Sequence, residues 1–373
     1  MNDEDTCNRL PRIIRIQMEQ KRNCALDIAK AICIILMVIG HSGCPTYLHN
    51  FIYMFHMPCF FFISGWLLNE RYIDNPKIGI VKKAKGIYVP YVKWTLFFIL
   101  LHNVFTRMHI YDSSYSLLIF WKRIIHAITM TDSEQLLGGY WFLISLFWAS
   151  VVTILLFSLL KKHNMLTHVN IWGGIIIFLF LSIIFKHLPF KLYQYYSEQT
   201  ILAIVFYMSG YYMKKRFGVI NKSIFGIILF IPLIIIAFFW HTGMAGPQGA
   251  KGFMILPYFI LAIFGTIALI TLSTYIRNWK ICKLFTYIGD KTLYILTFHF
   301  LAFKTVSFFY LYINELSIEQ LAEFPTLSNA SVGMSFIYTL VGVIFPLSLW
   351  EFLDKLKNRF FNSVKHTRNK KII

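Results

Sequence analysis

Charged side chains are scarce in this sequence of 373 residues, because Asp, Glu, Lys and Arg together make up only 14% of it. Hydrophobic residues make up 57% and aromatic residues 18%. A soluble domain carries more charge on its surface, so this composition excludes a soluble globular protein and predicts an integral membrane protein. The apolar runs also leave no stretch that is long enough for a separate soluble domain.

The sequence also lacks the patterns of several common sites. Its six cysteines include no CxxC pair, and it contains no HExxH motif, no cluster of carboxylates and no P-loop. We therefore expect no disulfide framework and no metal site. Residues 1–22 lack the apolar core of a signal peptide, so we interpret residues 1–23 as a polar cytoplasmic tail.

Long apolar runs, in contrast, fill most of the chain. A helix needs about 20 apolar residues to cross the hydrocarbon of a bilayer. On this criterion we predict an all-α integral membrane protein with about ten transmembrane helices between residues 24 and 352. The predicted spans are two within 24–68 and one each at 88–105, 140–160, 169–185, 199–213, 223–240, 253–275, 285–310 and 331–352. Residues 117–129 are too short and contain two basic residues, so we expect an amphipathic helix on the outer membrane–water interface.

The net charge of +19 falls in alternate loops rather than in one patch. Basic residues collect before the third predicted span, after the fourth and sixth, and in residues 353–373. The positive-inside rule therefore places both termini in the cytoplasm, with 353–373 as a basic cytoplasmic tail. This distribution predicts a lipid bilayer as the partner and no nucleic acid.

The first two predicted spans carry ionisable side chains, which usually face a bundle interior or a water-filled cavity. At about 100° per residue, Asp27, Lys30 and His41 share one face of the first span. Asp27 and His41 lie about 21 Å apart along the helix axis, so Asp27 cannot orient His41. His56 lies on the returning span, about one turn below the residues near positions 52 and 53 that should face His41.

The order of motifs resembles the acyltransferase-3 family. A basic residue followed by LDIAKAICIILMVIGHS and FIYMFHMPCFFFISGWLL is similar to the start of that family, and FHMPCFFFISGWL is the most specific segment. Looser similarities are a basic segment ending at Pro90, GGYWFL at 138–143 and IGDKTLYILTFH at 288–299. The resemblance implies a multispanning membrane acyltransferase in a bacterial plasma membrane, because many members acetylate surface sugars.

Three histidines lie at comparable depth toward the outer side of the predicted bundle: His41, His56 and His299. They could line one outward-facing cavity, with Tyr140 and Trp141 binding substrate at its mouth. Histidine suits general base catalysis, so we predict His41 as the base and His56 and His299 as further catalytic candidates. Each histidine could instead form hydrogen bonds between packed helices, and the two aromatic residues could belong to an interfacial belt.

Four lysines predict a basic site on the inner side: Lys30, Lys82, Lys83 and Lys85. Under the resemblance they would hold the phosphates of acetyl-CoA or another acyl-CoA, the donor substrate. The family usually has arginines at this motif, and a lysine cannot grip a phosphate in bidentate fashion. The alternative is that these lysines anchor the helices to anionic lipid. Asp27 and Asp290 are expected to pair with the cations.

These features predict transfer of an acyl group, acetyl by resemblance, from cytoplasmic acyl-CoA to a hydroxyl of an extracytoplasmic sugar or glycolipid. The acceptor could attack the thioester directly or react with an acyl-histidine intermediate, and the sequence does not decide between these routes. It also leaves open N-acylation instead of O-acylation, the identity of the acceptor and the oligomeric state. The alternative from another class is a transporter or flippase for a lipid-linked sugar or related anion, although the sequence shows no inverted repeats. A scaffold without catalysis is a third reading, which the shared face of Asp27, Lys30 and His41 disfavours.

Overall fold

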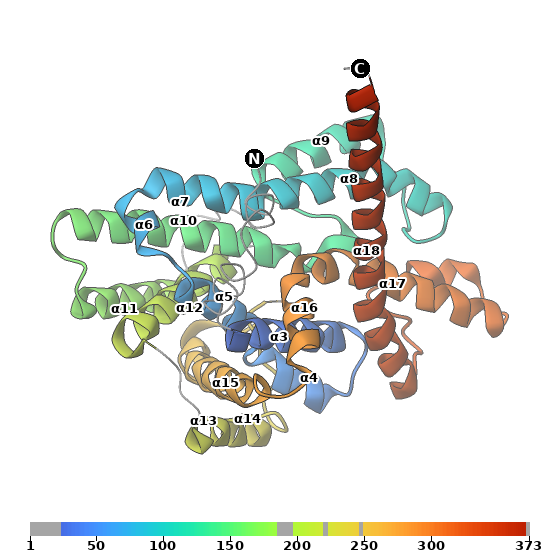
Figure 1. Ribbon diagram of the computed structural model, residues 1–373. Coiled ribbons are helices and arrows are strands. Elements are labelled where there is room, and N and C mark those ends of the chain that lie inside the picture. Colours follow the sequence, from blue (N-terminus) through green and yellow to red (C-terminus); the bar gives the residue numbers. More distant parts are fainter. Residues whose placement is uncertain (1–23, 185–196, 219–222, 246–248, 371–373) are drawn as a thin grey trace.

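The computed structural model describes residues 24–184, 197–218, 223–245 and 249–370, and these residues form helices without a strand. In chain order the elements are α3 (Cys24–His41), α4 (Thr46–Tyr53), α5 (His56–Trp66), α6 (Glu70–Asp74), α7 (Pro76–Lys83), η1 (Ala84–Tyr88), α8 (Val89–Arg107), α9 (Leu117–Thr129), η2 (Gln135–Tyr140), α10 (Trp141–Lys162), α11 (His168–Ile184), α12 (Ser197–Phe217), α13 (Ile224–Ile228), α14 (Phe230–Ile236), η4 (Gly252–Met254), α15 (Ile255–Ile276), α16 (Cys282–Asp290), α17 (Thr292–Ile313), η5 (Ile318–Ala322) and α18 (Val332–Lys370). In Figure 1, α18 is a long helix that crosses the direction of α8 and α10.

Six helical segments within the described residues are long and apolar enough to cross a membrane. They are Cys24–His41, Pro76–Arg107, Gln135–Lys162, Gly252–Ile276, Thr292–Ile313 and Val332–Arg359. The predicted all-α integral membrane class is confirmed. The count of about ten spans and the cytoplasmic position of both termini stay predictions.

The returning span that was expected within residues 51–68 is broken into two short helices. α4 ends at Tyr53 and α5 begins at His56, with Phe55 outside the helical region at φ −141° and ψ −21°. Pro58 lies in the first turn of α5, where the absence of its backbone N–H costs no helical hydrogen bond. With 11 residues, α5 alone is shorter than a bilayer crossing, so the returning segment is not one continuous helix.

Two further predicted spans are divided. The run 285–310 is interrupted at Lys291, which separates α16 from α17. The run 223–240 forms the short helices α13 and α14. The last predicted span continues without interruption into the expected tail, because α18 extends to Lys370. Residues 117–129 do form the expected helix, α9, and Ala127 is buried in it.

The core is organised around α3, which packs against α5, α15, α16 and α18. Helix α5 in turn crosses α12 at very short distance, because glycines lie at the crossing on both helices. A Cβ atom on Gly65 would lie 1.8 Å from the carbonyl oxygen of Tyr207, and one on Gly210 would lie 1.9 Å from that of Phe62. The two backbones therefore approach closely where small residues meet.

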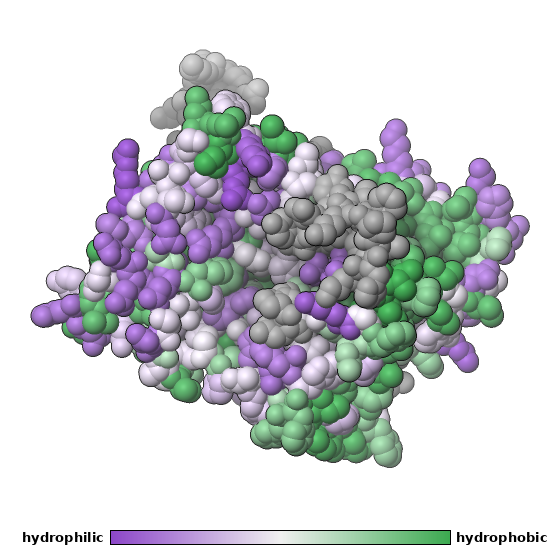
Figure 2. All heavy atoms as spheres, turned by 180° about the vertical axis from the view of Figure 1, so that it is seen from behind, coloured by the Kyte–Doolittle hydropathy of each residue, from purple (hydrophilic) through white to green (hydrophobic). Residues whose placement is uncertain are grey.

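Apolar side chains also cover parts of the exterior. Figure 2 shows them gathered at the lower edge of the molecule, over α13 and α14. The exposed residues there include Phe225, Ile231, Phe238 and Phe239. An apolar exterior of this kind is what lipid contact requires, and it fits the membrane assignment.

Candidate functional site

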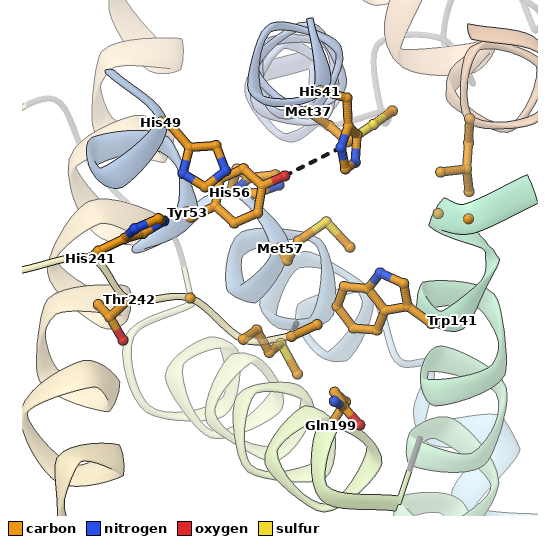
Figure 3. Close-up of a pocket in the computed structure, with 16 residues that line it drawn as sticks. Met37, His41, His49, Tyr53, His56, Met57, Trp141, Gln199, His241 and Thr242 are labelled. Atoms are coloured by element: carbon orange, nitrogen blue, oxygen red, sulfur yellow. Dashed lines mark hydrogen bonds between the residues drawn. The ribbon is translucent and has the colours of Figure 1, made fainter. Parts of the chain in front are cut away.

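A cavity of about 400 Å³ lies where α3, α4, α5, η2, α10, α12 and the segment after α14 meet (Figure 3). Its lining residues are Met37, His41, His49, Tyr53, His56, Met57, Gly138, Gly139, Trp141, Gln199, His241, Thr242, Gly243, Met244, Ala245 and Leu296. The structure thus brings His41, His56 and Trp141, three of the residues predicted from sequence, to one cavity.

His41 is the last residue of α3, and it faces the cavity. Its Nδ1 atom is hydrogen-bonded to the hydroxyl of Tyr53 at 3.3 Å. The residue opposite His41 is therefore at position 53, as the tight connection predicted. Asp27 lies at the other end of α3, so the prediction that it cannot orient His41 is confirmed.

His299 lies behind His41 rather than on the cavity surface. The two imidazole rings are stacked with centroids 5.6 Å apart, and the Phe300 ring packs 5.0 Å from that of His41. His299 is fully buried, and its Nδ1 donates to the carbonyl oxygens of Ile295 and Leu296 at 3.0 Å. Its Nε2 has no hydrogen-bond partner. His41 and His299 therefore form one pair, although α3 and α17 are far apart in the chain.

His56 is buried at the start of α5 and lines the same cavity. Its Nδ1 donates to the carbonyl oxygen of Ile52 at 2.8 Å, so in the neutral ring Nε2 is the nitrogen without a proton. The ring centroids of His56 and Tyr53 are 5.0 Å apart. Tyr53 therefore lies between His41 and His56.

Two further histidines, His49 and His241, line the cavity and were not predicted. The His49 ring stacks on Tyr53 at 3.8 Å, and His241 meets His49 edge-on at 5.0 Å. Burial and the neighbouring His241 lower the pKa of His49 to about 4, so His49 is neutral at physiological pH. The spacing of four residues from His49 to Tyr53 places both on one side of α4, and it was the signal in the sequence.

Of the two aromatic residues predicted to bind substrate, only Trp141 lines the cavity. Trp141 lines the cavity from the start of α10. Tyr140 is fully buried and its hydroxyl is hydrogen-bonded to the Thr297 hydroxyl at 2.8 Å. Tyr140 does not line the cavity, so its observed contact holds η2 against α17.

The predicted inner basic residues lie outside the cavity. Lys30 forms an ion pair with buried Asp27 at 2.7 Å, which confirms the expected pairing. Lys83 is half-buried with its Nζ 5.6 Å from the Tyr207 ring centroid, whereas Lys82 and Lys85 are exposed. Asp290 is exposed at the end of α16, next to a glycine that packs on the backbone of Asp27.

The segment between α17 and α18 covers the histidine pair from one side. The Phe324 ring packs 4.6 Å from that of Phe300. Lys304, buried in α17, fixes this segment because its Nζ donates to the carbonyl oxygens of Leu321, at 2.7 Å, and Glu323. Within the part of the chain that the structure describes, no group of three or more His, Cys, Asp or Glu side chains could hold a metal ion.

The sequence profile of the acyltransferase domain family matches residues 23–351, which is most of the chain. The chain belongs to this family. Among curated proteins it is similar to nodulation protein NolL of Mesorhizobium japonicum, with 26% identity over 238 residues, 59% of this chain and 57% of that protein. It is also similar to nodulation protein NolL of Sinorhizobium fredii, with 27% identity over 186 residues, 47% of this chain and 46% of that protein.

The chain therefore spans about half the length of the curated relatives it matches. No solved structure matches it. Membership of the acyltransferase domain family, together with the apolar helices, makes the chain an integral membrane protein.

Proposed function

We propose that this protein is a membrane O-acyltransferase. It transfers an acyl group from cytoplasmic acyl-CoA to a hydroxyl of an extracytoplasmic carbohydrate or glycolipid at the bacterial plasma membrane. The resemblance to the family favours acetyl as the acyl group. The observation that carries the proposal is the position of His41. It is hydrogen-bonded to Tyr53, stacked on His299 and open to a cavity, in a member of the acyltransferase domain family.

His41 acts as the general base. When its Nδ1–H donates to the Tyr53 oxygen, its Nε2 is left to take the proton of the acceptor hydroxyl. The acceptor oxygen then forms a C–O bond with the thioester carbonyl carbon, and the C–S bond breaks. The proton passes from His41 to the sulfur of CoA, so the histidine returns neutral. His56 and His299 donate through Nδ1 to backbone carbonyls, and the His299 ring packs against that of His41.

The donor enters from the side of the lysines. Lys82 and Lys85 are three residues apart on a helical run and both are exposed, so both ammonium groups can reach one phosphate-bearing group. Lys83, beside the Tyr207 ring, contributes positive potential near this side, whereas the charge of Lys30 is offset by Asp27. The extended pantetheine arm of the donor brings the thioester from the lysines to His41.

The test is release of free CoA from acetyl-CoA supplied to the cytoplasmic face of inside-out vesicles that contain native membrane glycans. Wild type is compared with His41→Ala and with His163→Ala, an exposed control, at matched protein levels. Removing a general base lowers the rate by about 100-fold or more, so His41→Ala should lose release while His163→Ala retains it.

Equal release by wild type and His41→Ala would move the base to His56 or His299. Absence of CoA release with every acyl-CoA tried would contradict acyl transfer and leave the transporter alternative. A burst of CoA release without acceptor, equal to the amount of protein, would select the acyl-histidine route over direct attack.

A further inference from the structure

A second group of ionisable side chains lies between α8 and the segment that leads into η2. Its centre is His102 of α8, which is 6% exposed, and Glu134, which is 2% exposed. The Nδ1 atom of His102 and the Oε2 atom of Glu134 are 2.8 Å apart. A buried ion pair is costly unless further hydrogen bonds satisfy both groups, so the partners around this pair decide what it contributes.

Both nitrogens of the His102 ring and both carboxylate oxygens of Glu134 have partners. Nε2 of His102 donates to the carbonyl oxygen of Ser113 at 2.9 Å, because a carbonyl oxygen can only accept. The Tyr115 hydroxyl donates to Oε1 of Glu134 at 2.9 Å. One proton is left to lie between Nδ1 and Oε2. With that proton on the imidazole the hydrogen bond is charge-assisted and stronger than a neutral one.

Aromatic rings fix the orientation of the His102 imidazole. The Tyr115 ring stacks on it with centroids 3.3 Å apart, and the Tyr111 ring lies 4.5 Å away. On α9, the Arg123 guanidinium lies 5.5 Å from the Tyr115 ring centroid and forms an ion pair with Asp132. Asp132 thus ties the segment before η2 to α9.

Glu134 directly precedes η2, which forms one wall of the cavity. Its backbone carbonyl oxygen accepts from the N–H of Leu137 at 2.8 Å, so the position of Glu134 sets where the first turn of η2 lies. The residues that follow, Gly138, Gly139 and Trp141, line the cavity. The hydrogen bonds of Glu134 therefore hold the beginning of this wall.

The same wall contacts the histidine pair. A Cβ atom on Gly139 would lie 2.8 Å from Cδ1 of Leu296 and 3.9 Å from Cε1 of His299. The His299 ring in turn stacks on that of His41, with centroids 5.6 Å apart. A displacement of η2 therefore reaches both Trp141 and the pair that contains the proposed base.

We propose that His102 and Glu134 form a positioning pair for the acyl transfer. The pair holds η2, and through η2 it keeps Trp141 and the His41–His299 pair in the arrangement that the reaction needs. This inference rests on the proposed function and adds to it two residues that act from outside the cavity.

The test separates positioning from stability by removing both partners at once. His102→Phe alone keeps a ring against the tyrosines but leaves the Glu134 carboxylate buried without its partner, so it should unfold at a lower temperature in detergent. The double variant His102→Phe/Glu134→Leu leaves neither charge, and its thermal stability should return close to that of wild type.

Two further variants serve as controls. Glu134→Gln keeps the hydrogen bonds, because its amide can donate to Nδ1 of His102 and accept from the Tyr115 hydroxyl. Asn103→Leu tests the loop alone. The exposed Asn103 side chain makes two hydrogen bonds with the backbone of Tyr115, at 3.1 and 2.7 Å, and so holds the same loop against α8.

Initial CoA release from acetyl-CoA is measured on the full chain in nanodiscs, with the total glycolipid extract of the native host cells as acceptor. We expect the double variant to release CoA about 10- to 100-fold more slowly than wild type, because a displacement of about 1 Å at a site can cost that much. Glu134→Gln and Asn103→Leu should behave like wild type. Release by the double variant at the wild-type rate, or an equal loss in either control, would overturn the positioning role. A double variant that stays as unstable as His102→Phe would show that the pair serves stability alone and would overturn it too.

A second measurement does not depend on acyl transfer. Hydrogen–deuterium exchange of the same proteins is followed by mass spectrometry without acyl-CoA. Peptides that cover residues 134–141 should exchange faster in the double variant than in wild type, Glu134→Gln and Asn103→Leu. Unchanged exchange there would refute the hold on η2. Faster exchange in the double variant together with no CoA release by wild type would instead refute the acyltransferase proposal and support the hold on η2.

Discussion

The position of Tyr53 depends on a glycine next to His41. A Cβ atom on Gly40 would lie 2.6 Å from the Tyr53 ring carbon Cε2, so any larger residue at position 40 would push the ring away. The absence of that side chain lets the phenol lie edge-on to His41, with ring centroids 6.2 Å apart, and hydrogen-bond to its Nδ1. The orientation of the proposed base is therefore set by three residues from two consecutive helices.

Replacing Tyr53 with Phe tests this orientation. The variant keeps the ring that packs on His49 and Gly40 and removes only the hydroxyl that contacts His41. We expect kcat for CoA release to fall about tenfold, the effect of one lost hydrogen bond to a reacting group, with little change in KM for acetyl-CoA. The matched control is Tyr338→Phe, whose hydroxyl bonds to Ser307 at 2.8 Å between α17 and α18. An equal loss in both variants would contradict a specific role for Tyr53.

The relative positions of the site's side chains were predictable where a single helix or a tight turn determines them. Helix periodicity placed Asp27 and Lys30 on one face, and the tendency of charges within spans to pair predicted their contact. The short connection after α3 predicted that a residue near position 52 or 53 faces His41, and Tyr53 does. His241 could not be predicted, because it lies in an irregular segment that only the packing of α14 and α15 brings beside His49. Tyr140 failed as a cavity residue because the direction of a side chain at a helix start depends on the 3₁₀ turn before it.

At the scale of elements, the crossing of α5 and α12 positions both His56 and Gln199. The contact is reciprocal, because a glycine of each helix faces a backbone carbonyl of the other. In a membrane, where lipid is as apolar as the side chains, such close backbone packing is a main source of helix association. The two helices therefore form one rigid support beneath the cavity.

Gly210→Ala should disrupt this support. Its Cβ would overlap the Phe62 carbonyl oxygen, a backbone atom that cannot rotate away, so we expect a loss of about 3 kcal/mol or more in stability. Gly173→Ala is the control, since a Cβ there meets nothing within 4 Å in α11 and should stabilise the helix by about 0.5–1 kcal/mol. Thermal unfolding in detergent measures both. A Gly210→Ala protein as stable as wild type would show that α5 and α12 can separate.

The elements themselves were predicted unevenly for a physical reason. Hydropathy reports whether a segment is apolar, and the runs around Phe55 and Lys291 are apolar on both sides of each break. The breaks arise from packing instead: Gly289, before the second break, lies against the backbone of Asp27, and α4 turns away to place Tyr53 beside His41. The amphipathic segment 117–129 was predictable because its two basic residues interrupt the apolar run within the helix itself.

At the scale of the whole molecule, the proposed reaction depends on orientation. The cavity is lined by residues 138–139, 242–245 and His49, which the positive-inside rule places on the outer side. The same rule places the basic clusters, including Lys82, Lys85, Lys161 and Lys162, on the opposite side. Donor and acceptor would thus approach the site from different sides of the bilayer, which is the arrangement that transfer from cytoplasmic acyl-CoA to a surface glycan requires.

This orientation predicts which cysteines an impermeant thiol reagent reaches in intact cells. In a Cys44→Ser background, Glu319→Cys in η5 should react from outside, and His163→Cys between α10 and α11 should react only in inside-out vesicles; both positions are exposed. The reason is the charge of the flanking loops, because Lys161 and Lys162 adjoin His163 whereas residues 311–330 contain no Lys or Arg. Labelling of His163→Cys in intact cells would show that the protein has the opposite orientation. The cavity would then open to the cytoplasm, with acceptor and acyl-CoA on the same side. The acyl group would then never cross the membrane, and the acceptor would have to be sought among cytoplasmic precursors.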